Sequence, residues 1–232
     1  MKSICVIPAR GGSKRIPKKN ILKLNGIPLI SYTIRAAIKS NQFDAIFVST
    51  ENEEIKSISL SEGVKVDDRP LHMAGDRVTK IEVIKEFLER HHNLNENDII
   101  TALLPTCPFR TQNHINEAFK LFKENSHTPF LVGVTEYEFP IQLALKKTES
   151  ETMSMVFKDG YNTTRSQNIE KRYHPNGAMY IARIGAFLKK NTFFNSKILT
   201  YEMEAIHSYD IDYPYQFDIA EILAKKIENN EL

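Results

Sequence analysis

Residues 3–20 read SICVIPARGGSKRIPKKN, and in this stretch an apolar run leads directly into a basic loop that contains two glycines. The apolar run at residues 3–8 has the composition of a buried β-strand. The loop holds five basic residues within the eleven positions from 10 to 20, namely Arg10, Lys14, Arg15, Lys18 and Lys19. A strand that opens into such a loop is typical of an anion site in an α/β protein, and the density of charge predicts a triphosphate ligand.

The chemistry of the loop supports this interpretation. Gly11 and Gly12 lack a Cβ, so their backbone N–H groups can approach phosphate oxygens closely. Arg10, Lys14 and Lys19 supply compensating charge, and Ser13 adds a hydroxyl donor. The spacing matches neither G-x-x-x-x-G-K-[ST] nor G-x-G-x-x-G, which excludes the P-loop and the dinucleotide-binding fingerprint.

Outward from this loop, strand-like runs rich in β-branched residues alternate with segments of helical periodicity. The first three pairs are residues 3–8 and 29–40, 45–49 and 52–61, and 98–104 and 113–123. This alternation predicts an α/β fold with a parallel sheet covered by helices on both faces. In the first helix Ile30, Ile34, Ala37 and Ile38 form the apolar stripe that we expect to pack on the sheet.

The pattern changes after a strand predicted at residues 130–134. Short strand-like pieces at 143–145 and 153–157 are separated by polar residues, so we expect an inserted arm at about 139–173. The chain then returns with a strand at 178–182, a helix at 184–190 and a strand at 198–203. A terminal helix at 217–227 carries Ile219, Ile222, Leu223 and Ile227 at helical spacing.

Composition limits the remaining possibilities. The 232 residues, 41% of them hydrophobic, suit a single domain over 1–232 that carries the arm. A net charge of +2 from 31 basic and 29 acidic residues lacks the basic excess of a general nucleic-acid binder. Two cysteines without paired spacing, and a first apolar run too short for a signal peptide or a bilayer span, predict a soluble cytoplasmic protein without a membrane or nucleic-acid partner.

Two acidic residues near the other end of the sequence form a candidate metal site. Asp210 and Asp212 are two positions apart, so in an extended backbone their side chains leave the same face. Mg²⁺ binds through one or two carboxylates together with substrate phosphates. We therefore expect Asp210 and Asp212 to hold Mg²⁺, the predicted cofactor.

Together these motifs resemble the sialic-acid-type (acylneuraminate or nonulosonate) cytidylyltransferases, which are CMP-sugar-acid synthetases. The opening segment 7–20 is similar to the first signature of that family. The other matching segments occur in the same order and extend the resemblance along the whole chain: 69–70, Asp76, 104–110, 165–167, 175–180 and 210–212.

The resemblance implies a three-layer Rossmann-like nucleotidyltransferase fold with a mostly parallel sheet and a small dimerisation arm. The implied activity transfers CMP from CTP to the 2-hydroxyl of a nine-carbon nonulosonic acid, of sialic, legionaminic or pseudaminic type, and releases pyrophosphate. Members of the family are homodimers in which the partner's arm approaches the active site. The implied partners are CTP, the sugar acid and a second copy of the chain.

The resemblance and the loop chemistry together assign roles to individual residues. The predicted catalytic residues are Arg10, Lys19, Arg165 and Asp212. The predicted nucleotide-binding residues are Ala9, Arg10, Gly11, Gly12, Ser13, Lys14, Asn20, Arg69 and Thr79. The predicted sugar-binding residues are Arg110, Arg165, Gln167 and Asn176. Thr79 is equally well placed to cap the helix that follows it.

Two departures from the family pattern leave the acceptor open. Leu104 stands where sialic-acid enzymes commonly have a glutamine, and the serines that the family often has near Val78 and Lys80 are missing. The alternatives are a cytidylyltransferase for an eight-carbon acid such as 3-deoxy-manno-octulosonate, a nucleotidyltransferase for an ordinary sugar phosphate, and a noncatalytic nucleotide- or RNA-binding module. The sequence identifies no general base.

Overall fold

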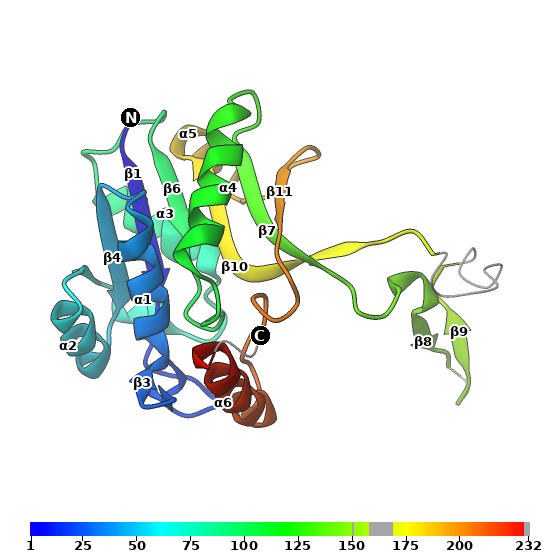
Figure 1. Cartoon of the computed structure of the whole chain (residues 1–232). Helices are drawn as coiled ribbons and strands as arrows, with labels where there is room; N and C mark the ends of the chain where they lie inside the picture. Colours follow the sequence, from blue (N-terminus) through cyan, green and yellow to red (C-terminus); the bar gives the residue numbers. More distant parts are fainter. Residues whose placement is uncertain (150, 158–168, 230–232) are drawn as a thin grey trace.

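A computed structural model describes residues 1–149, 151–157 and 169–229 of the protein, which are built around one seven-stranded sheet (Figure 1). The strand order is β11-β7-β10-β6-β1-β4-β5. Every neighbouring pair is parallel except the two that involve β10. The bounds are β1 Ser3–Pro8, β4 Ala45–Thr50, β5 Lys65–Asp68, β6 Ile99–Ala102, β7 Phe130–Glu136, β10 Tyr173–Arg183 and β11 Leu199–Glu202.

Helices cover both faces of this sheet, because side chains alternate between the faces along each buried strand. In β1, Cys5 and Ile7 pack in the cluster that includes residues of α1 (Leu29–Ser40), α2 (Glu53–Ser61) and α4 (Gln112–Glu124). Ile4 and Val6 pack in the opposite cluster with α3 (Lys80–Arg90) and α5 (Ile184–Lys190). Figure 1 shows α1 and α4 in front of the sheet and α3 behind it. The protein therefore has three layers, as predicted.

A third cluster anchors the C-terminal helix α6 (Pro214–Glu228) beneath the basic loop. Ile16 from that loop, Ile211 from the acidic segment and Phe217 from α6 share this cluster. The 3₁₀ helix η1 (Lys19–Ile21) and the short strands β2 (Lys23–Leu24) and β3 (Ile27–Pro28) lead from the loop into α1. Burial of apolar side chains thus joins the two ends of the sequence at one edge of the sheet.

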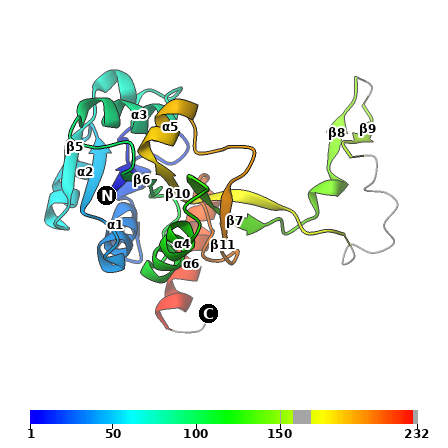
Figure 2. The ribbon, with the colours of Figure 1, turned by 90° about the horizontal axis from the view of Figure 1, so that it is seen from above.

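The arm leaves the sheet where β7 ends and returns through β10. It contains the 3₁₀ helix η3 (Ile141–Leu143) and a separate two-stranded sheet of β8 (Leu145–Lys147) and β9 (Met153–Met155). Figure 2 shows this part projecting away from the body. Several of its large apolar side chains are exposed: Phe139, Leu143, Leu145, Met153, Val156 and Phe157.

Most predicted elements are confirmed, and the differences concern strand direction and side-chain burial. The first three strand and helix pairs, the helix at 184–190 and the terminal helix are present. The predicted stripe of α1 was wrong at Ile38, which is 43% exposed because Ile30, Ile34 and Ala37 already fill the face toward the sheet. In α6, Ile219 and Ile222 are also exposed, because Phe217, Ala220 and Ala224 form the buried face. Among the described residues no helix is long and apolar enough to cross a membrane.

Candidate active site

A pocket of about 480 Å³ lies at the carboxyl end of β1, where loops from both ends of the chain meet. Its lining combines predicted site residues with others from the β6–α4 loop. The lining residues are Pro8, Arg10, Ser13, Lys14, Arg15, Ile16, Lys19, Asn20, Asp76, Leu104, Pro105, Thr106 and Asp212. The carboxyl edge of a sheet of this kind is where α/β proteins bind ligands.

One wall of the pocket is basic and is held by Asp76. Arg10 donates to the carbonyl of Gly75 at 3.0 Å and pairs with Asp76 at 3.1 Å. Lys14 pairs with the other carboxylate oxygen of Asp76 at 2.5 Å. The hydrogen bond from Lys14 is the main cause that lowers the pKa of Asp76. Asp76 therefore holds two of the predicted phosphate-binding cations on the same side of the pocket.

A second part of the pocket lining is formed by Asp212 and the cations paired with it. Lys19 Nζ lies 3.0 Å from one carboxylate oxygen of Asp212, and Arg15 lies 3.0 Å from the other. Lys19 also donates to the carbonyl of Ile211 at 2.6 Å. Partial burial opposes the charged carboxylate, but the bonds from Lys19 and Arg15 outweigh it and lower the pKa of Asp212.

Asp210 has the opposite electrostatic environment. Burial raises its pKa, and the charge of Asp212 raises it further, while a hydrogen bond from Thr106 acts in the other direction. One of its oxygens lies 3.9 Å from Cys107 Sγ, and the other would lie 3.6 Å from a Cβ placed on Gly177. Two carboxylates close enough to repel, one of them poorly solvated, form a set that a divalent cation would stabilise.

The backbone of the loop is less available to a ligand than the sequence indicated. The N–H of Gly11 donates to Glu51 Oε1 at 2.7 Å, and the N–H of Ala9 donates to the carbonyl of Ser49 at 3.0 Å. A Cβ on Gly11 would come within 2.7 Å of the Asn52 side chain, whereas a Cβ on Gly12 would meet no atom within 4 Å. The absence of a Cβ at Gly11 thus permits close packing against the start of α2. The next backbone N–H along the loop is that of Gly12.

Three predicted binding residues, Arg69, Arg110 and Asn176, are buried and bonded to the protein itself. Arg69 donates to the carbonyl of Ser49 at 2.6 Å, and Arg110 donates to Thr33 Oγ1 at 2.7 Å and to the carbonyl of Ala178. Asn176 donates to Ser208 Oγ at 2.9 Å and accepts from the N–H of Ala178 at 3.0 Å. None of the three lines the pocket, so here they support its walls; their substrate contacts stay predictions.

The remaining predicted residues have different positions. Asn20 lines the pocket and its amide holds the carbonyl of Arg10 at 2.9 Å. Thr79 caps α3 in a reciprocal arrangement with Glu82, which confirms the structural role expected of it. Arg165 and Gln167 lie outside the described residues.

Sequence reasoning did not single out two charged residues beside the pocket. Glu51 supplies the carboxylate for Gly11, and its Oε2 is buried without a hydrogen-bond partner among the described residues. Lys80 places its Nζ 4.3 Å from the centre of the Tyr180 ring, and burial lowers its pKa while the charge of Asp210 opposes this effect. Lys80 could have been noticed from the sequence, because it stands at the first position of a predicted helix, where the helix dipole disfavours a cation.

Comparison with known proteins gives an end-to-end match. The family model described as "Cytidylyltransferase" matches residues 4–231. A pseudaminic acid cytidylyltransferase of Campylobacter jejuni is 34% identical over 227 residues, which cover 97% of both chains. An N-acylneuraminate cytidylyltransferase of Streptococcus agalactiae is 37% identical over 216 residues, 91% of this chain and 51% of that protein. The chain thus spans about half the length of that second relative.

Solved structures share the fold. A CMP:2-keto-3-deoxy-manno-octonic acid synthetase complexed with CTP superposes with a TM-score of 0.70 at 16% identity, over 98% of this chain and 100% of that one. A 4-diphosphocytidyl-2C-methyl-D-erythritol synthase from Anaerococcus prevotii gives a TM-score of 0.66 at 11% identity, over 97% and 98%. At such identities the likeness concerns architecture alone.

Proposed function

Since this chain belongs to the cytidylyltransferase family, we propose that it transfers CMP from CTP to the 2-hydroxyl of a nine-carbon nonulosonic acid and releases pyrophosphate. The observation that carries the proposal is the end-to-end similarity to a pseudaminic acid cytidylyltransferase, combined with one pocket that gathers Arg10, Lys14, Lys19 and Asp212. The acceptor is a nonulosonic acid of the pseudaminic or sialic type, because enzymes named for both are more than 30% identical to this chain over the aligned residues.

The pocket suits in-line attack of the sugar hydroxyl on the α-phosphorus of CTP. Negative charge grows on the phosphoryl oxygens and on the leaving pyrophosphate as the bond to the leaving group breaks. Arg10 and Lys14, which pair with Asp76, and Lys19, which pairs with Asp212, are the cations positioned to stabilise it. Loss of one such contact typically costs about 3 to 4 kcal/mol of transition-state stabilisation.

The residues present also fit Mg²⁺. Among the described residues no cluster of three or more histidine, cysteine or acidic side chains could hold a metal ion without further ligands. Mg²⁺ needs only one or two carboxylates when phosphates complete its coordination, and Asp210 and Asp212 would provide them. When bound, the ion would supply Lewis-acid stabilisation of phosphate charge.

We also propose a cytoplasmic homodimer joined through the arm. Its support is the apolar surface at Phe139, Leu145 and Met153, which a second copy would bury, and the projection of the arm from the body (Figure 2). Cys5 and Cys107 are free and buried, in keeping with a reducing compartment. A monomer by light scattering at micromolar concentration would contradict the dimer.

The test is pyrophosphate release from CTP with MgCl₂ and one candidate acceptor at a time. Pseudaminic, legionaminic and N-acetylneuraminic acids are compared with 3-deoxy-manno-octulosonate. We expect turnover with at least one nine-carbon acid. Turnover with the eight-carbon acid alone would replace the proposal by its rival, and CTP binding without turnover of any acid would favour the noncatalytic alternative.

A further inference from the structure

Lys80 is a half-buried cation beside the pocket for which the proposed chemistry has no use. Its Nζ lies 4.3 Å from the centre of the Tyr180 ring, and Tyr180 is only 3% exposed. Leu104, which lines the pocket, packs against the same hydrophobic cluster as Tyr180. A Cβ on Gly177 would lie 3.6 Å from both Leu104 and Asp210, so these two residues border one small region, and the charge of Asp210 acts on both Lys80 and Tyr180.

The position of Lys80 is electrostatically unfavourable when no ligand is bound. It is the first residue of α3, where the helix dipole repels positive charge. Burial opposes its charged form more strongly than the charge of Asp210 favours it, and no ion pair joins it to a carboxylate within the part of the chain that the structure describes. Lys14 and Lys19, in contrast, both have a direct carboxylate partner. A contact with one aromatic ring compensates only partly for these costs.

We propose that Lys80 binds an oxyanion of a substrate at this edge of the pocket, beside Leu104 and Asp210. Both substrates of the proposed reaction carry such a group: the carboxylate of the sugar acid and the phosphates of CTP. The inference rests on the proposed function for the identity of these substrates. An ammonium group held over an apolar wall suits an anion, because the wall excludes water and strengthens the interaction.

The test compares K80M and K80R with the wild type. Methionine keeps the apolar stem over Tyr180 and removes the charge, whereas arginine keeps the charge. The matched control is K85M, because Lys85 lies on the same helix and pairs with Glu89 at its exposed surface, 4.0 Å away. Circular dichroism and thermal unfolding confirm that each variant is folded.

Two measurements separate the two sources of the oxyanion. Calorimetric titration of CTP in MgCl₂ gives the Kd of the nucleotide. Steady-state kinetics give the KM of the nonulosonic acid and of its 1-carboxamide, which lacks the carboxylate charge. A charged hydrogen bond of ordinary strength corresponds to about a tenfold effect or more.

If Lys80 holds the carboxylate, K80M raises the KM of the acid at least tenfold, leaves the Kd of CTP unchanged and no longer discriminates between acid and carboxamide. If it holds a phosphate, K80M raises the Kd of CTP at least tenfold. In either case K80R restores most of the affinity and K85M changes nothing. A folded K80M with both constants within twofold of the wild type overturns the proposal. The wild type's turnover tests the proposed function separately, since the CTP titration needs no acceptor.

Discussion

Lys19 and Asp212 are 193 positions apart in the sequence and form an ion pair of 3.0 Å in the wall of the pocket. The same ammonium group holds the carbonyl of Ile211, whose side chain is fully buried against α6. The segment that leads into the C-terminal helix therefore holds Asp212 against the basic loop through the buried side chain of Ile211 and ion pairs with Lys19 and Arg15.

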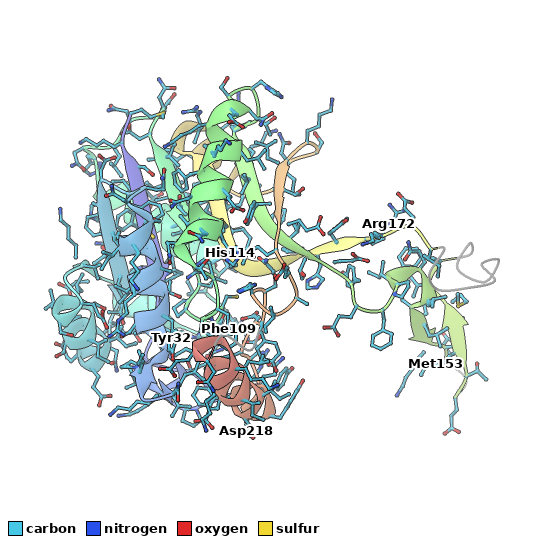
Figure 3. The ribbon with its side chains drawn as sticks, in the orientation of Figure 1. Tyr32, Phe109, His114, Met153, Arg172 and Asp218 are labelled. Atoms are coloured by element: carbon cyan, nitrogen blue, oxygen red, sulfur yellow. The ribbon has the colours of Figure 1, made fainter. Side chains whose placement is uncertain are left out.

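Asp212→Asn should abolish magnesium-dependent turnover without unfolding the protein. The amide lacks the negative charge that attracts Mg²⁺ and pairs with Lys19 and Arg15, so we expect a loss of about a hundredfold or more in kcat. The measurement is pyrophosphate release across a MgCl₂ titration. The control is Asp218→Asn, because Asp218 lies exposed on α6 (Figure 3). Near-normal activity of Asp212→Asn would remove Asp212 from the proposed metal site.

Lys19→Met should lower kcat/KM for CTP about a hundredfold, because a cation aimed at the phosphates is lost while the stem is kept. Its control is Lys18→Met. Lys18 is adjacent in sequence but pairs with Glu54 at 2.7 Å and does not line the main pocket. Equal losses in both variants would show that general positive charge, and not the position of Lys19, is what matters.

Gly11→Ala and Gly12→Ala form a matched pair that tests the packing of the loop against α2. The added methyl group at Gly11 would come within 2.7 Å of the Asn52 side chain, which caps α2, while at Gly12 it meets open space. We expect Gly11→Ala to lower the free energy of unfolding by about 1–3 kcal/mol, as overpacking typically does. Gly12→Ala should leave it nearly unchanged. Urea unfolding without nucleotide measures both, and equal stabilities would contradict the tight packing.

The pH dependence of stability should reveal His114, the α4 residue labelled in Figure 3. Burial, followed by the charge of nearby His207, lowers its pKa from 6.5 to about 4. Between these values the unfolded chain binds a proton that the folded protein does not, so stability falls as pH falls from about 6.5 to 4. This part of the dependence should disappear in His114→Gln but persist in His127→Gln, where the histidine is exposed. Urea midpoints at pH 4.5 and 7 provide the comparison.

The sequence predicted the layers and the pocket well, for reasons that are physical. Parallel strands bring their carboxyl ends to one edge, so a basic loop after the first strand and acidic residues after a late strand could be expected to meet. The pairing of Lys19 with Asp212 is compatible with that expectation. Thr79 as a helix cap followed from local chemistry alone.

Burial of charged side chains could not be predicted in the same way. Arg69 and Arg110 are of a residue type that commonly binds anionic ligands, yet both are buried and bonded to interior oxygen atoms. Their partners come from distant segments, so only the tertiary structure shows that several of these donors bond to the protein itself. The antiparallel direction of β10 was equally invisible, because it depends on the route of the chain through the arm.

β10 runs from the base of the arm to the candidate active site. Tyr173 at its start pairs with Glu136 at the base of the arm, and four positions later Gly177, with a positive φ of 75°, borders Asp210. A single strand therefore carries the chain from the base of the arm to the residue beside this carboxylate, with a register irregularity between Pro175 and Tyr180.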